Sequence, residues 1–161
     1  MWPINFRSYT TLAPTTKANN QTVTTVGWAR GNASDMLLRW FPVNIDISLT
    51  LLRVQRSDDS TNGSDGTWST VGNSTFGTSL ITGGAIGAVS VLPTASDAGK
   101  FWTVYIPKAR YLYYRWNFTV GAGSTGTQYV ADAIGFGLFQ GPSTDVDRGG
   151  VTGSFLVSVN D

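Results

Sequence analysis

Short runs of β-branched and aromatic residues alternate with turns rich in glycine, asparagine, aspartate and serine along nearly the whole chain of 161 residues. Runs of this kind between such turns predict strands, and none of them has the 3.6-residue period of an amphipathic helix. The sequence therefore predicts an all-β fold, a single antiparallel β-sandwich or jelly roll of about eight strands. The sandwich domain is expected to span residues 21–161. The expected strands are 21–28, 36–41, 44–57, 67–72, 100–107, 127–139 and 151–159, together with one in the stretch 108–120.

The stretch KARYLYYRWNFTV, residues 108–120, is the most aromatic part of the chain. Successive side chains of a strand point to opposite faces, so its two parities predict two different surfaces. The even positions are nearly all apolar and are expected to face the core, with Trp116 as a core residue. The odd positions leave Tyr111, Tyr113 and Arg115 as an outer stripe. That stripe either makes ordinary cross-strand pairs or binds a partner. The even positions are Arg110, Leu112, Tyr114, Trp116, Phe118 and Val120.

Two other segments carry specific expectations about strand ends. Pro42 is expected to stop the strand 36–41, because proline lacks a backbone N–H. In residues 44–57 apolar side chains keep one parity up to Leu51 and then change parity at Val54. A β-bulge near Leu51 and Leu52 would explain this change of phase.

Residues 1–20 have two prolines, a polar end and no clean period. We interpret this segment as an extended N-terminal arm, and a first strand followed by a loop is the alternative. Five large apolar side chains in it would need to be covered, which makes them candidates for binding a partner. They are Trp2, Ile4, Phe6, Tyr9 and Leu12.

The composition offers few side chains that commonly act in catalysis. The chain has no histidine and no cysteine, and its ten acidic residues are all aspartates. Histidine is the commonest general base and a common metal ligand, so we expect no enzyme, no catalytic residue and no cofactor. Asp132 is the one aspartate in the middle of a predicted strand. It is expected to pair with a strand arginine, and an Asp132-based enzyme is the alternative.

The loop DDSTNGSDG, residues 58–66, places oxygen-bearing side chains at close spacing. Carboxylate and amide oxygens can hold calcium, but the spacing is not that of an EF-hand, and the same residues are good turn formers. We therefore predict an exposed hairpin connection with no required metal. The oxygen-bearing residues are Asp58, Asp59, Asn62 and Asp65.

Charge and hydropathy bear on the possible partners. The formal net charge is +1, which gives no overall field to attract nucleic acid, so no nucleic-acid partner is expected. No apolar run approaches the roughly 20 residues of a membrane span, so no membrane partner is expected either.

Two segments carry a resemblance to a known family. IDISLTLLRVQRSDDSTNGSDGTWSTVG is a strand, an acidic turn and a returning strand. GKFWTVYIPKARYLYYRWNFTVGAGSTGTQYVADAIGFGLF is a strand ending in proline, the aromatic strand, a turn and a strand of small residues. This layout, over roughly residues 45–72 and 99–140, resembles the small jelly-roll group of tailed-phage capsid decoration (cement) proteins.

The resemblance implies a structural virion protein on the outside of an icosahedral capsid. Its partners would be the major capsid protein and further copies of itself in a homo-oligomer. The resemblance does not cover residues 1–20, but the apolar side chains of this arm lead us to predict that it reaches onto a neighbouring subunit or the shell. A carbohydrate- or receptor-binding β-sandwich of a phage tail or spike is the alternative function. That module would use exposed rings as a sugar platform, chosen from Trp28, Trp40, Trp68 and Tyr113.

Overall fold

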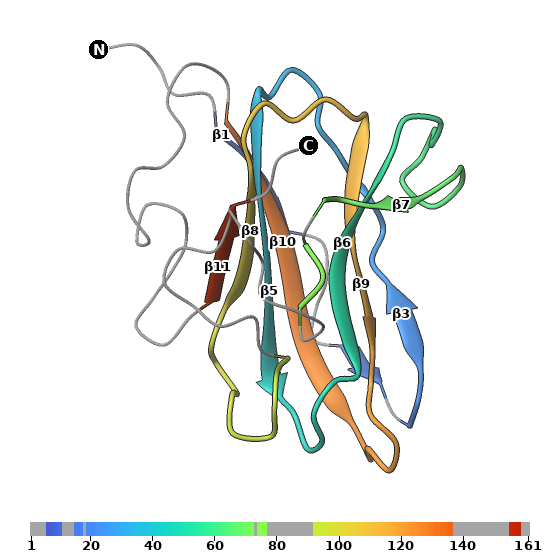
Figure 1. Cartoon of the computed structure of the whole chain (residues 1–161), viewed down its shortest axis with the longest axis vertical. Helices are drawn as coiled ribbons and strands as arrows, with labels where there is room; N and C mark the ends of the chain where they lie inside the picture. The colour runs from blue at the N-terminus through green and yellow to red at the C-terminus, as the bar shows by residue number, and fades with distance from the viewer. Residues whose placement is uncertain are drawn as a thin grey trace.

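The computed structural model describes residues 6–10, 15–17, 19–72, 74–76, 92–136 and 155–158. Of residues 6–10, 15–17, 136 and 155–158 it describes the backbone alone. Within these ranges the chain contains eleven strand segments and no helix. The strands form two sheets that face each other as two layers (Figure 1). This confirms the predicted all-β sandwich.

The first layer is a six-stranded sheet with the order β1-β10-β5-β8-β11, in which β2 also pairs with β10. Its pairs are antiparallel except for β11, which runs parallel to β8. The strands are β1 (Phe6–Thr10), β2 (Thr15–Lys17), β5 (Asp35–Asn44), β8 (Trp102–Ile106), β10 (Thr127–Phe136) and β11 (Phe155–Ser158).

The second layer is a five-stranded antiparallel sheet with the order β3-β9-β6-β7, in which β4 also pairs with β9. The strands are β3 (Thr22–Thr24), β4 (Trp28–Ala29), β6 (Leu51–Ser57), β7 (Ser69–Thr70) and β9 (Tyr113–Thr119). Four of the eleven segments, β2, β3, β4 and β7, have only two or three residues. The seven longer ones account for most of the predicted strands.

Large aromatic side chains from both sheets fill the space between the layers. Trp40 of the six-stranded sheet lies 5.5 Å, between ring centroids, from Phe118 of the five-stranded sheet. Phe118 also meets Tyr129 edge to face at 4.6 Å. All three side chains are buried, and such offset contacts are favourable beyond the area they bury. These rings hold the two layers together.

Within β9, the even-numbered side chains of the aromatic strand face the core, as predicted. Tyr114, Trp116 and Phe118 are fully buried, and so is Val120, which follows the strand. Leu112 departs from the prediction, because it is 48% exposed. It precedes the strand, in a turn where its N–H donates to Asp58, so the alternation of a strand does not reach it.

Two expectations about strand ends are wrong. β5 continues through Pro42 to Asn44, and the register against β10 shifts between Gln128 and Tyr129, so Val43 is bulged out. A bulge is one of the places where a sheet accepts a residue without an N–H.

The second error concerns the start of β6. Residues 45–50 are not a strand, and β6 begins at Leu51 with unbroken register against β9. Ile45 and Leu49 are nevertheless buried, since this connection packs its apolar side chains into the same core. A change of element, and not a bulge at Leu51 and Leu52, explains the change of phase.

The N-terminal segment is paired within its own chain where it is described. β1 lies antiparallel to β10 from Phe6 opposite Phe136 to Thr10 opposite Asp132, and β2 pairs with β10 further along. The partner strand that the sequence did not reveal is therefore β10. Residues 1–5 and 11–14 lie outside the described residues.

Candidate functional site: the outer face of the five-stranded sheet

The outer face of the five-stranded sheet carries two of the three stripe residues that the sequence singled out. Tyr113 and Arg115 lie on β9 opposite Ser57 and Gln55 of β6. Tyr111 does not join them, because it precedes the strand and packs against the main core. The guanidinium carbon of Arg56 lies 4.0 Å from the centroid of the Tyr111 ring.

Arg115 is held between a strand neighbour and the loop that joins β6 to β7. Its Nε donates to Oε1 of Gln55 at 3.0 Å. Its guanidinium carbon lies 3.9 Å from the ring centroid of Trp68, a cation–π contact that fixes the planar head group. The indole N–H of Trp68 in turn donates to the carbonyl oxygen of Asp65 at 2.7 Å.

The same loop reaches Tyr113, whose hydroxyl donates to the carbonyl oxygen of Thr61 at 3.0 Å. Contacts within the chain thus hold both stripe residues, as expected for ordinary cross-strand and loop packing. A role of Tyr111, Tyr113 and Arg115 in binding a partner stays a prediction.

A second arginine, which the sequence reading did not single out, lies beside Arg115. Arg53 of β6 is opposite Asn117 of β9, and its Nε donates to Oδ1 of Asn117 at 2.8 Å. Arg53 and Arg115 are therefore diagonal neighbours on one face. Burial, and then the positive charge of Arg53, lower the pKa of Arg115. The alternation in LLRVQRS, in which Arg53 and Gln55 share the parity opposite to Leu52 and Val54, was the signal that could have found this pair.

The loop of residues 58–66 is a hairpin connection, as predicted, because β6 and β7 pair directly across it. Asp65 accepts hydrogen bonds from Ser60 Oγ, from both N–H and O–H of Thr61, and from the N–H of Asn62. The hydrogen bonds from Thr61 and Ser60 lower the pKa of Asp65 far below its usual range. The carboxylate serves as the central acceptor of the loop.

The loop is also docked on the segment before β4. The N–H of Gly27 donates to the carbonyl oxygen of Gly63 at 2.7 Å. Gly63 has a φ of 83°, and a Cβ there would lie 2.4 Å from the carbonyl oxygen of Gly27. Glycine satisfies both the positive φ and the close backbone approach.

The other side chains of this loop that could bind a metal are also used as acceptors. Asp58 accepts from the N–H of Leu112. Asp59 accepts from Ser57 Oγ and from the N–H of Thr67, and these two hydrogen bonds lower its pKa. Asn62 Oδ1 accepts from two N–H groups of the loop. Among the residues that the structure describes, no three carboxylate, histidine or cysteine side chains are grouped as metal ligands.

Asp132 behaves as the sequence predicted. Its carboxylate accepts two hydrogen bonds from Arg39, one from Nε at 2.8 Å and one from Nη2. The two residues are opposite one another on β10 and β5, so this bidentate pair joins two central strands of the six-stranded sheet.

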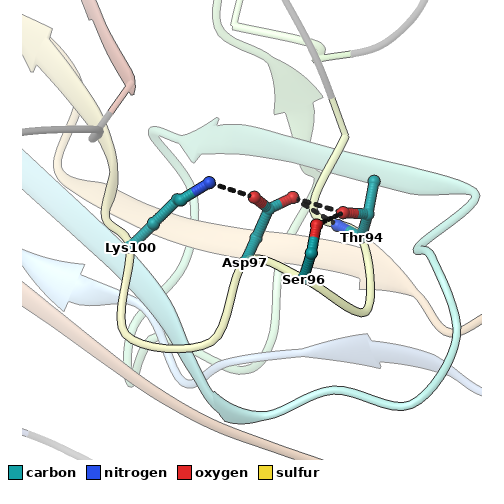
Figure 2. Close-up of polar contacts among 4 residues, drawn as sticks. All are labelled: Thr94, Ser96, Asp97 and Lys100. Atoms are coloured by element: carbon teal, nitrogen blue, oxygen red, sulfur yellow. Dashed lines mark hydrogen bonds and ion pairs between the residues drawn. The ribbon is translucent and has the colours of Figure 1, made fainter.

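Asp97 organises the turn that leads into β8 (Figure 2). Its carboxylate accepts from the N–H and the O–H of Thr94 and from Nζ of Lys100, which lies 2.6 Å away. Thr94 Oγ1 is also 3.0 Å from Ser96 Oγ. Burial raises the pKa of Asp97, but the hydrogen bonds from Lys100 and Thr94 outweigh it and leave the pKa below the usual value.

Two further aspartates fasten distant segments. Asp46 accepts from Ser124 Oγ, from Thr125 N–H and Oγ1, and from the N–H of Gly126, and these bonds hold its pKa far below the usual range. Asp35 accepts from the hydroxyl of Tyr105 at 2.6 Å and from the N–H of Lys108. Every one of these acceptors ties a loop to a strand or to another loop.

The structure corrects the proposed sugar platform. Trp28 is 2% exposed and Trp40 is fully buried, so neither can stack on a sugar; both lie on core-facing parities of their strands. Trp68 and Tyr113 are half-buried, and both are engaged by the contacts described above.

The candidate arm residues are only partly placed. Phe6 and Tyr9 belong to β1, opposite Phe136 and Ala133 of β10. Their side chains, and Trp2, Ile4 and Leu12 altogether, lie outside the described residues. Their role in binding is therefore a prediction.

Comparison with known proteins found no matching family model, no similar curated protein and no similar solved structure. In the described part of the chain, no helix is long and apolar enough to cross a membrane.

Proposed function

We propose that the chain is a structural virion protein, which decorates and stabilises the outside of an icosahedral tailed-phage capsid. Its partners would be the major capsid protein and further copies of itself. The resemblance of residues 45–72 and 99–140 to the small jelly-roll cement proteins supports this proposal, and the two-layer β-sandwich is compatible with it.

The hydrogen bonds of the aspartates support a structural role for this protein. The chain has no histidine, cysteine or glutamate, so aspartates would have to supply most acid–base or nucleophilic chemistry. In the described part of the chain, each aspartate accepts hydrogen bonds that fasten a turn, a loop or a strand pair. They are Asp35, Asp46, Asp58, Asp59, Asp65, Asp97 and Asp132.

The large apolar residues of 1–20 make the proposed contact with a neighbouring subunit or with the shell. β1 is an edge strand of the six-stranded sheet. Burying three such side chains at an interface could contribute roughly 5–8 kcal/mol before the cost of ordering them. Repetition over a symmetric shell would multiply that contribution.

Co-sedimentation with undecorated capsids tests the contact. Deleting residues 1–5 removes Trp2 and Ile4 but keeps β1, whereas deleting residues 1–20 also strips β1 and β2 from β10. The proposal expects the wild type to sediment with capsids and the shorter deletion to bind more weakly while staying folded. Equal binding by the wild type and the shorter deletion would refute a role for Trp2 and Ile4.

A glycan array separates the proposal from the carbohydrate-binding alternative. Specific binding to one class of glycan, lost in Trp68→Ala or Tyr113→Ala, would favour the alternative. Two of the four rings proposed for it are in the core, so the decoration role is the one we propose.

A further inference from the structure

Arg53 and Arg115 share an arrangement that differs from that of Arg39 and Lys100, which pair with carboxylates. Each guanidinium is oriented by a neutral amide through Nε, from Asn117 and Gln55 respectively. Both amide side chains belong to buried residues, at 4% exposed for Asn117 and 8% for Gln55. In the described residues, neither arginine has a carboxylate partner, and their Nη groups make no hydrogen bond.

Among the described residues, no ion pair compensates these two positive charges. By register, the other side chains on this face of the sheet are uncharged, and they include Leu51, Ser57, Thr70, Tyr113 and Thr119. Asp59 and Asp65 of the adjoining loop accept hydrogen bonds within the loop, and neither forms an ion pair with Arg53 or Arg115. Like charges on diagonal positions of a sheet repel each other, so an anion that contacts both arginines would relieve a repulsion as well as form new bonds.

The orientation of the two guanidinium groups determines which kind of ligand they can bind. When Nε is already bonded, the Nη groups of a guanidinium remain as donors in one plane, which suits the oxygens of a carboxylate. Trp68 packs against Arg115 and limits how far that head group can turn. The pair is thus organised before any ligand arrives, which lowers the entropic cost of binding.

We propose that Arg53 and Arg115 form a docking site for carboxylate side chains of an acidic protein segment. A protein surface fits better than nucleic acid, because two arginines in a chain of net charge +1 make too few phosphate contacts for polyanion binding. The inference does not depend on that partner being a capsid.

Nuclear magnetic resonance of the full chain tests the site with a short poly-aspartate peptide at low ionic strength. The Nε–H signals of Arg53 and Arg115 should shift with saturation. Arg53→Gln and Arg115→Gln should each bind the peptide about threefold to tenfold more weakly. Lys108→Gln is the matched control, since it removes one exposed positive charge from another part of the surface, and its affinity should stay unchanged.

Arg115→Gln also loses the stack on Trp68, so Arg115→Lys provides a second variant that keeps the charge and loses the planar fork. Weaker binding by Arg115→Lys supports a geometric site. Unmoved Nε–H signals in the wild type, or equal weakening by Lys108→Gln, would overturn the proposal. Tighter binding of an oligothymidylate of the same charge would also overturn it, because the ligand would then be a phosphate chain.

Discussion

The guanidinium of Arg115 on β9 lies against the indole of Trp68, in the loop that joins β6 to β7, with 3.9 Å between the guanidinium carbon and the ring centroid. This contact joins a strand to a loop more than forty residues earlier in the chain. It explains why the hairpin connection lies against the sheet.

Trp68→Ala is expected to release that loop and lower the free energy of unfolding by about 1–2 kcal/mol, from the lost cation–π contact and packing. Urea unfolding measures the change. Trp68→Phe keeps a ring but loses the N–H bond to Asp65, so it should recover part of the loss. An unchanged midpoint in Trp68→Ala would contradict the stack as a stabilising contact.

Trp116→Ala is expected to cost ~3–5 kcal/mol, because it empties a fully buried site in the core. Thermal unfolding should show a large drop in Tm. Leu112→Ala, which truncates a half-exposed residue of the same parity just before β9, is the control and should change little. If Trp116→Ala kept the wild-type Tm and lost only partner binding, the core assignment would be wrong.

Asp132→Asn breaks the bidentate pair with Arg39. The two side chains are 10% and 26% exposed, so the pair is partly screened and the expected loss is about 1–2 kcal/mol. A double-mutant cycle with Arg39→Gln, read by chemical unfolding, isolates the coupling between the two residues. A coupling energy of zero would show that the two side chains do not stabilise each other.

Acid should destabilise the fold through the loop aspartates. Hydrogen bonds lower the pKa of Asp46 and Asp65 in the folded chain, so the stability they give is present above the unfolded value of about 4 and is lost as pH falls below it. Tm should therefore stay nearly level from neutral pH down to about pH 5 and then fall.

Asp65→Asn tests that assignment. The substitution removes one carboxylate that takes up a proton only when the chain unfolds. The Tm of the variant should be lower than that of the wild type at neutral pH, but it should fall less steeply as the pH is lowered. Asp58→Asn is the control, because a single main-chain N–H bonds that carboxylate. Parallel acid profiles for the wild type and Asp65→Asn would contradict the role given to this hydrogen-bonded carboxylate.

The sequence predicts those parts of the fold that depend on local alternation. The burial of Tyr114, Trp116 and Phe118 follows from their parity, and the pairing of Asp132 with an arginine follows from a lone carboxylate in the middle of a strand. Leu112 shows the limit of this reasoning, because parity applies only after β9 begins at Tyr113.

What the sequence could not predict depends on long-range contacts. The docking of the loop on Gly27, and the contact of Tyr113 with Thr61, join residues whose proximity no local pattern encodes. The burial of Ile45 and Leu49 from a connection that is not a strand has the same cause. Arg53 lies on a predictable parity, but its position beside Arg115 requires the register of β6 against β9.

A low-resolution electron cryo-microscopy reconstruction of the parent particle tests the proposed function most directly. The account predicts density the size of a small two-layer sandwich, repeated with the symmetry of the shell on the outer surface of the capsid and touching neighbouring capsomers. Density for this chain confined to a tail or spike, or a capsid whose outer surface lacks it, would contradict the account and favour the receptor-binding alternative.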